Sequence, residues 1–193
     1  MGKISVIETS IKDLVIVEPA VFGDSRGWFY EAYSERDYNA AGLTYRFVQD
    51  NRSFSAAKGT LRGIHFQRGG SAQAKLVWAG KGEVLDVAVD LRAGSPTYLK
   101  WEAVVLTDEN KRQFMIPRGF GHAFLTLTDD VEFCYKADNF YDAAADGGIR
   151  FDDPQIGIDW GAYFEGYADG AGLILSDKDR SAPLAKDADT GFV

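Results

Sequence analysis

The chain of 193 residues is poor in cysteine, histidine and positive charge. Its one cysteine, Cys134, excludes an internal disulfide framework and suits a reducing compartment. Only two histidines, His65 and His122, are present, so soft metal ligands are scarce. The 21 basic residues against 29 acidic ones give a net charge of −8. This argues against nucleic-acid binding, which needs a basic face, but leaves room for a small anionic ligand.

Long apolar runs are missing as well. No stretch approaches the roughly 20 apolar residues of a membrane-spanning helix. Residues 1–10 lack the basic-then-apolar order of a signal peptide. Together with the single cysteine, these absences predict a soluble cytoplasmic protein with no membrane partner. The length predicts a single domain over 1–193, large enough for a substantial core.

What the sequence does contain is a series of short strand patterns. Residues 84–91 (VLDVAVDL) alternate, with Asp86 and Asp90 on one face, which predicts a half-buried strand. Similar runs lie at 14–18, 29–33, 46–51, 62–67, 75–79, 101–106, 113–116, 123–128 and 131–136. Many short strands at close spacing predict an all-β sandwich, jelly roll or barrel.

Helices and turns complete this outline. Short peripheral helices are expected at about 34–41, with Gly42 as the stop, and within 177–188. Gly80-Lys81-Gly82 is interpreted as a hairpin turn.

The most specific local pattern is IPRGFGHAF at 116–124, which contains Pro-x-Gly-x-x-His ending at His122. It resembles the second motif of the cupin superfamily. The first cupin motif normally supplies two metal-binding histidines one residue apart, but the matching stretch here has His65 followed by Gln67. A divalent ion would then have two histidines and at best one distant carboxylate, fewer than the three protein ligands usual at catalytic sites. The sequence therefore predicts a cupin-type double-stranded β-helix (jelly roll) that uses no metal.

His65 has two interpretations. It is either an inert, hydrogen-bonded barrel residue or a general base, since imidazole titrates near neutral pH. Alternation puts His65 and Gln67 on one face of the strand at 62–67, with Ile64 and Phe66 on the other. Period two alone does not show which face is inside, so both interpretations stay open at this point.

Three other positions also carry a structural and a functional interpretation. Lys75 lies in an otherwise apolar run, so its ammonium must meet an anion or keep to a wet cavity. Tyr135 shares a strand face with Phe133, and is either a core aromatic or a proton donor facing a cavity. Asp177 and Asp179 are acids at a helix start, unless one of them orients a histidine.

From about residue 15 to 183 the chain resembles the dTDP-4-dehydrorhamnose 3,5-epimerase family of metal-free cupins. The matching motifs are VFGDSRG at 21–27, FVQDN at 47–51, LRGIHFQ at 61–67, GEVLDVAVD at 82–90, NKRQ at 110–113, IPRGF at 116–120, YKA at 135–137, IGIDW at 156–160 and LSDKD at 175–179. The resemblance implies a homodimer that inverts C3 and C5 of dTDP-4-dehydro-6-deoxy-D-glucose without any cofactor.

The resemblance also implies roles for individual residues. The base falls on His65, the acid on Tyr135, the carboxylate that pairs with the base on Asp179, and a group near the C4 oxygen on Lys75. Nucleotide and sugar contacts fall on Arg26, Glu31, Gln49, Asn51, Arg62, His122 and Lys178. An aromatic near the thymine falls on Tyr141, and an acidic loop position, usually Glu in the family, is Asp146. The family places some N-terminal contacts in the partner's site, so Arg26 and Glu31 are expected to act across the dimer.

These residue types suit the implied chemistry. Protons beside a ketone are acidic, so a neutral imidazole can remove one, and a cation can stabilise the enolate oxygen. Inversion then needs a proton from the opposite face. Three alternatives remain: a mono-epimerase for a related dTDP-sugar, a non-catalytic metal-free cupin that binds a small ligand, and a metal-dependent cupin enzyme, which Gln67 disfavours.

Overall fold

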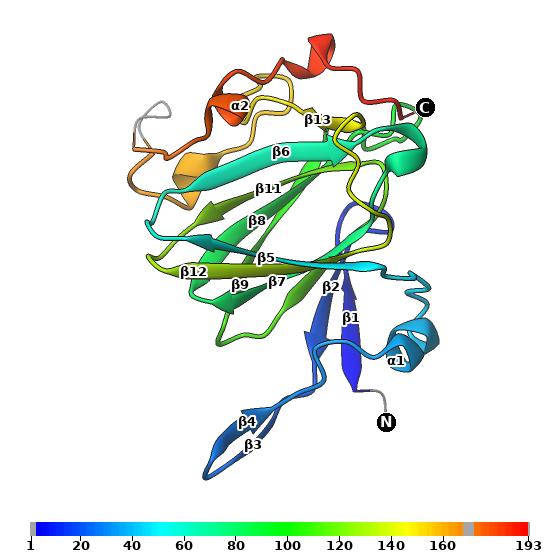
Figure 1. Ribbon diagram of the computed structural model, residues 1–193, viewed down its shortest axis with the longest axis vertical. Coiled ribbons are helices and arrows are strands. Elements are labelled where there is room, and N and C mark those ends of the chain that lie inside the picture. The colour runs from blue at the N-terminus through cyan, green and yellow to red at the C-terminus, as the bar shows by residue number, and fades with distance from the viewer. Residues whose placement is uncertain (1–2, 168–171, 193) are drawn as a thin grey trace.

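The computed structural model describes residues 3–167 and 172–192, and its two main sheets lie face to face (Figure 1). One sheet has six strands in the order β1 (Ile4–Glu8), β2 (Val15–Pro19), β10 (Gln113–Ile116), β7 (Lys75–Lys81), β12 (Val131–Ala137) and β5 (Gln49–Ser55). The other has five, in the order β13 (Asp146–Gly148), β6 (Leu61–Gln67), β11 (Phe120–Thr126), β8 (Glu83–Asp90) and β9 (Trp101–Thr107). Consecutive strands repeatedly change sheet, so the predicted cupin-type jelly roll is confirmed.

Two predicted features, a strand at 29–33 and a hairpin turn at 80–82, were wrong. A strand is expected at 29–33, but the chain forms a hairpin just before it, from β3 (Phe22–Asp24) and β4 (Gly27–Phe29). Gly27 has φ 134°, a conformation that favours glycine, and it begins the second strand of this hairpin. The predicted hairpin at 80–82 instead joins β7 of one sheet to β8 of the other.

Helices are few and short, as expected. α1 (Glu35–Ala40) lies within the predicted segment, and α2 (Asp177–Arg180) covers only the start of the second one. Pro183 disfavours helix at the residue before it, which explains the early end of α2. The described residues also contain three short 3-10 turns: η1 (Gly69–Ser71), η2 (Trp160–Ala162) and η3 (Ala185–Asp187). Among the described residues no helix is long and apolar enough to cross a membrane.

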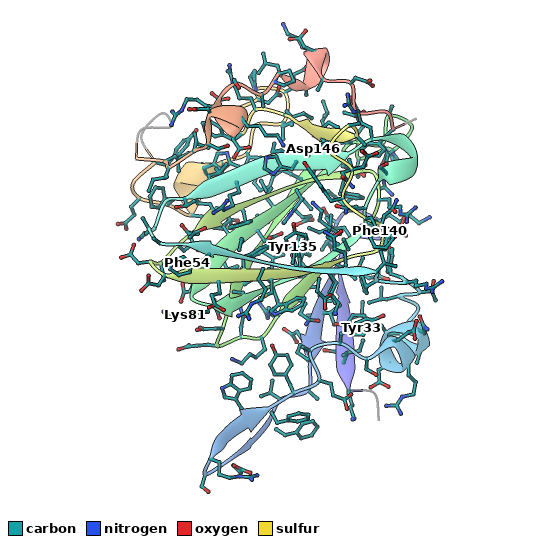
Figure 2. The ribbon with its side chains drawn as sticks, viewed as in Figure 1. Tyr33, Phe54, Lys81, Tyr135, Phe140 and Asp146 are labelled. Atoms are coloured by element: carbon teal, nitrogen blue, oxygen red, sulfur yellow. The ribbon has the colours of Figure 1, made fainter. Side chains whose placement is uncertain are left out.

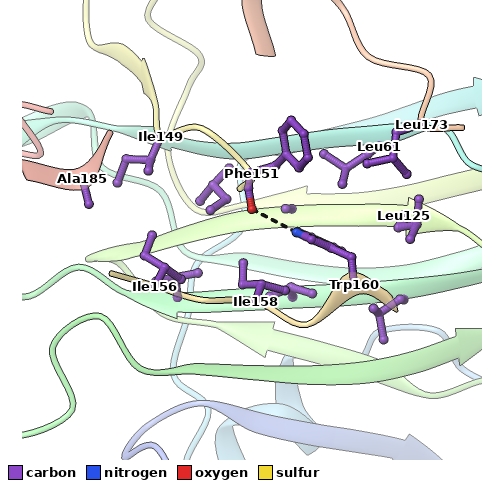
Figure 3. Packing of buried hydrophobic residues seen from close by; sticks show 14 of the residues in the cluster. Leu61, Leu125, Ile149, Phe151, Ile156, Ile158, Trp160, Leu173 and Ala185 are labelled. Carbon is purple, nitrogen blue, oxygen red and sulfur yellow. Dashed lines mark hydrogen bonds between the residues drawn. The ribbon is translucent and has the colours of Figure 1, made fainter. Parts of the chain in front are cut away.

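The five-stranded sheet is covered on both faces. Residues 84–91 are buried almost throughout, so the predicted half-buried strand is wrong. The odd-numbered side chains of β8 pack under the C-terminal segment, where Trp160 is fully buried and donates its indole N–H to the Phe151 carbonyl at 2.9 Å (Figure 3). The even-numbered ones face the space between the two sheets. This second face, with Asp86 on it, forms part of the cavity described below.

Candidate active site

A cavity of about 530 Å³ lies between the two main sheets. Apolar side chains such as Phe124 and Phe133 form part of its wall. Polar residues that the sequence singled out also line it: Arg62, His65 and His122 from the five-stranded sheet, Lys75 and Tyr135 from the six-stranded sheet, and Lys178 and Asp179 from α2. An apolar pocket with a few convergent polar groups is the usual form of a small-molecule site.

His65 and Asp179 form a hydrogen-bonded pair on one wall of this cavity. The Nε2 atom of His65 lies 2.5 Å from Oδ1 of Asp179. The Asp179 N–H donates to the side chain of Ser176, the residue that caps α2. Burial alone would raise the pKa of Asp179, but the bond to His65 and a backbone N–H from Gly63 hold that pKa below its ordinary value. Asp177 is exposed, so Asp179 is the carboxylate that meets the histidine.

Arg62 reaches the same cavity as His65, although strict alternation would put the two on opposite faces of β6. His65 pairs with His122 on β11. Three residues earlier on β6, Arg62 pairs with Phe124, only two residues further along β11. The extra residue in β6 returns Arg62 to the face of His65. Gly63 lies in this shift with φ 126°, and a Cβ there would be 2.6 Å from the His122 carbonyl oxygen, so the strands approach closely only because of glycine.

Lys75 and Tyr135 face the cavity from the six-stranded sheet, and Figure 2 shows Tyr135 near the middle of the molecule. The Nζ atom of Lys75 lies 5.6 Å from the centre of the Tyr135 ring. Burial lowers the pKa of Lys75 to about 8, although Asp86 and Asp146 favour its charged form. Burial also raises the pKa of Tyr135, so its phenol keeps its proton at neutral pH.

His122 also has a carboxylate partner, which the sequence analysis missed. Its Nε2 atom lies 2.8 and 3.0 Å from the two carboxylate oxygens of Asp86 on β8, and both residues are buried. The His122 ring stacks on Phe133, with 5.9 Å between ring centres. Burial raises the pKa of Asp86, against the opposite effect of His122 and Lys75. The available signal was Asp86 itself, a carboxylate in the middle of a strand whose direct neighbours Leu85 and Val87 are apolar.

A smaller adjoining cavity of about 200 Å³ holds two more predicted residues, Tyr141 and Asp146. It shares Lys75, Tyr135 and Lys178 with the main cavity. Lys178 forms an ion pair with Asp146, and the Tyr141 hydroxyl donates to the same carboxylate at 3.4 Å. The two cavities therefore share part of their walls and form one region, with the smaller one beside β6 and β13.

Gln49 and Asn51 come from β5, beside this region. Asn51 pairs with Tyr135 across the β5–β12 ladder. Gln49 donates its Nε2 hydrogen to Asn51 at 2.9 Å and accepts the Tyr141 backbone N–H at 3.1 Å. The Asn51 Nδ2 atom is buried and has no hydrogen-bond partner within the described part of the chain.

Arg26 and Glu31 are predicted residues that line neither of these two cavities and contact none of their lining residues in the described hydrogen bonds and ion pairs. Arg26 lies on the β3–β4 hairpin, which projects away from the two sheets (Figure 1), and it pairs with Asp24 at 2.6 Å. Glu31 forms an ion pair with Lys3.

Gln67 has a structural role at the position where cupins usually have a second histidine. Its amide nitrogen donates to the Ser71 carbonyl at 2.8 Å, and its amide oxygen accepts the Asp142 N–H at 2.6 Å. These bonds fix two loops at the rim of the cavity. Within residues 3–167 and 172–192, no three His, Cys, Asp or Glu side chains lie together in a way that could hold a metal ion.

Known proteins are similar to this chain in sequence and in fold. The family model described as dTDP-4-dehydrorhamnose 3,5-epimerase matches residues 8–187. The dTDP-4-dehydrorhamnose 3,5-epimerase of Salmonella typhimurium is 49% identical over 184 residues, which cover 95% of this chain and 96% of that protein.

Solved structures extend the comparison. The dTDP-6-deoxy-D-glucose-3,5-epimerase of Legionella pneumophila, in complex with dTDP-4-keto-L-rhamnose, is 45% identical with a TM-score of 0.89, covering 96% of this chain and 95% of that one. A 3'-monoepimerase from Streptomyces bikiniensis, in complex with dTDP-quinovose, is 34% identical with a TM-score of 0.81, covering 92% and 86%. The family model covers most of the chain and the relatives match it over nearly their whole length, so the chain belongs to the dTDP-4-dehydrorhamnose 3,5-epimerase family.

Proposed function

We propose that this protein inverts C5 and C3 of dTDP-4-dehydro-6-deoxy-D-glucose and releases dTDP-4-dehydro-L-rhamnose. The observation that carries the proposal is one cavity in which a histidine–aspartate pair, a lysine and a tyrosine converge from three strands and from α2. Such a set suits proton abstraction beside a ketone, which needs a base, a stabilised enolate oxygen and an acid. No redox or metal chemistry is required for this reaction.

His65 is the base in this proposal. Its Nε2–H donates to Asp179, which leaves the lone pair on Nδ1 free to take a proton from carbon. The imidazole becomes imidazolium in this step, and the adjacent carboxylate stabilises the new positive charge. A side chain that is one third exposed can meet a bound sugar, whereas a fully packed one cannot.

Lys75 stabilises the negative charge that develops on the C4 oxygen. Its ammonium is present at neutral pH, because burial lowers the pKa of Lys75 only to about 8. A fixed cation in a cavity shielded from bulk water acts in a lower dielectric than in solution, where charge stabilisation is stronger.

Tyr135 returns a proton to the carbon from the opposite face. It comes from the six-stranded sheet, whereas His65 comes from the five-stranded sheet, so acid and base approach the cavity from different walls. Each inversion moves one proton from carbon to His65 and one from Tyr135 to carbon. Proton exchange with water then returns His65 and Tyr135 to their starting protonation states, so the reaction consumes no co-reactant.

The remaining predicted residues are assigned to binding. Arg62 offers a guanidinium for the diphosphate, since arginine can bind oxyanions through two N–H groups. His122 and Lys178 contact the same cavity, and Gln49, Asn51, Tyr141 and Asp146 border the adjoining region that suits the nucleotide. Asp146 is one methylene shorter than the Glu usual in the family.

We further infer that the protein works as a homodimer in the cytoplasm. Its product would be a precursor of the rhamnose in surface polysaccharides. Support comes from the β3–β4 hairpin, where Phe22, Trp28 and Phe29 are 55–65% exposed. Exposed aromatics grouped on a projecting hairpin are typical of a protein interface. In such a dimer Arg26 and Glu31 belong to the partner's site.

Mixing two inactive variants tests this arrangement. If Arg26 acts in the partner's site, an equal mixture of Arg26→Ala and His65→Ala chains forms mixed dimers with one intact site, and activity returns to about a quarter of wild type. If Arg26 acts within its own chain, or the protein is a monomer by sedimentation, the mixture stays inactive.

Product identification tests the activity itself. We expect NMR to show the L-rhamno configuration, with both centres inverted, when the protein acts on dTDP-4-dehydro-6-deoxy-D-glucose. The alternative is inversion of one centre, which the likeness to a 3'-monoepimerase keeps open because that protein shares the fold. A bound but unchanged substrate would identify a non-catalytic cupin and overturn the proposal.

A further inference from the structure

Asp86 is a buried carboxylate that the mechanism above does not use. Its exposed fraction is 0%, and it lies on the face of β8 that is turned toward the space between the sheets. A carboxylate in such a place is costly unless opposite charges or hydrogen-bond donors compensate it. Groups near Asp86 must therefore compensate its negative charge, and the charge of Asp86 in turn affects the orientation and the protonation of those groups.

Two such groups line the cavity. His122 on β11 directs Nε2 at both Asp86 oxygens, at 2.8 and 3.0 Å. Lys75 on β7 is the second, because it lines the same cavity as His122, the residue that Asp86 contacts, and the negative charge of Asp86 favours its ammonium. The groups that act on Lys75 from the elements around it are Asp86 from β8, Asp146 from β13, Lys178 from α2 and the Tyr135 ring from β12.

We propose that Asp86 is a positioning residue of the proposed epimerase, which orients the His122 ring and keeps Lys75 as an ammonium beside the ketone. This inference rests on the proposed function. Asp86 touches no substrate in this account and acts through its two neighbours. Burial lowers the pKa of Lys75 and so favours the neutral amine, whereas the negative charge of Asp86 favours the ammonium.

The variant Asp86→Asn tests the proposal with almost no change in side-chain volume. We expect kcat to fall about tenfold near pH 8, because the enolate loses its stabilising charge. We expect KM to change by less than about threefold, because the side-chain oxygen of the new asparagine can still accept a hydrogen bond from His122 and keep its ring in place. The loss of activity at alkaline pH should begin about one pH unit lower than in wild type, with partial recovery in more acidic buffer. A purely structural role would reduce the rate equally at every pH.

Asp90→Asn is the matched control. Asp90 lies on the same strand and is also 0% exposed, but it accepts bonds from Arg92, Ser95 and Thr97. None of these lines the main cavity. This variant should lose stability and keep the wild-type pH profile.

Imidazole NMR gives a readout that does not depend on turnover. The chain has two histidines, so the ¹⁵N spectrum contains two imidazoles. In the wild-type protein His122 should carry its proton on Nε2, facing Asp86, and the Lys75 ε-methylene should titrate at a higher pH than in Asp86→Asn. An unprotonated Nε2 on His122, equal Lys75 midpoints, or parallel pH profiles would overturn the proposal. Absence of any epimerisation by the wild type would instead overturn the proposed function, and these NMR outcomes would still be informative.

Discussion

The two histidine–aspartate pairs lie side by side on one wall of the cavity, yet they differ in burial and in origin. His65 and His122 are cross-strand neighbours, and each directs Nε2 at a carboxylate. The side chain of His65 is 33% exposed, against 9% for His122. Asp179 comes from a helix at the rim, 114 residues away in sequence, whereas Asp86 comes from the adjacent strand. In the proposed mechanism the same chemical pair serves two purposes: the accessible pair exchanges a proton with the substrate, and the buried pair holds its position.

The carboxylates of the two pairs also respond differently to their surroundings. Burial acts on both, but hydrogen bonds to His65 and Gly63 hold the pKa of Asp179 below its ordinary value. In Asp86 burial dominates, and its pKa is raised. An ionised partner suits a base that must become positive, because it stabilises the imidazolium.

The largest expected effect is at His65. We expect His65→Ala to keep its fold and lose activity by about a hundredfold to ten-thousandfold, the usual contribution of a general base. The measurement is kcat, with thermal unfolding as the check on the fold. A variant that keeps more than about a tenth of the wild-type rate, a change under about 1.4 kcal/mol in the barrier, would show that His65 is not the base.

Asp179→Asn comes next. The amide can still contact His65 but no longer fixes the tautomer or stabilises the imidazolium, so we expect kcat to fall about a hundredfold or more. Asp177→Asn is the control, since this exposed acid lies on the same helix. Equal losses in the two variants would mean that the charge near α2 matters and the pairing does not.

Tyr135→Phe should have a smaller effect on proton removal than on inversion. We expect product formation to fall about tenfold to a hundredfold, while C–H exchange with solvent continues in recovered substrate, because His65 is intact. NMR of the reaction mixture measures both. If exchange stopped at C3 and at C5 together, Tyr135 would not be the acid on the opposite face.

The mildest effect is the pH dependence of the unmodified protein. Since burial lowers the pKa of Lys75 to about 8, its ammonium is present below that pH and is lost above it. We therefore expect kcat to decline as pH rises through about 8, and Lys75→Met to be slow and to lack this decline. A wild-type rate that stays constant up to about pH 10 would show that turnover does not depend on the Lys75 ammonium.

Much of the site could be predicted because its residues sit in local motifs. His65, Lys75, Tyr135 and His122 lie on strands whose patterns were readable, and the resemblance assigned their roles. The residues themselves left Asp177 and Asp179 as equal candidates, and only the resemblance chose Asp179, because no spacing rule links a helix residue to a histidine 114 positions earlier.

Other features depend on contacts that no local pattern encodes. Alternation separates Arg62 from His65, and only the register shift at Gly63 reunites them. The pattern at 84–91 shows two faces but not what covers each, so the pairing of Asp86 with His122 stayed hidden. In both cases the arrangement depends on contacts with β11, the neighbouring strand.

Deuterium incorporation tests the central claim, that His65 removes protons on both sides of the ketone. The protein is incubated with dTDP-4-dehydro-6-deoxy-D-glucose in D₂O, and NMR follows C5 and C3 with wild type and with His65→Ala. We expect deuterium at both carbons with wild type and none at either carbon with the variant. Exchange at the wild-type rate in His65→Ala, or no exchange at either carbon with the wild type, would contradict it.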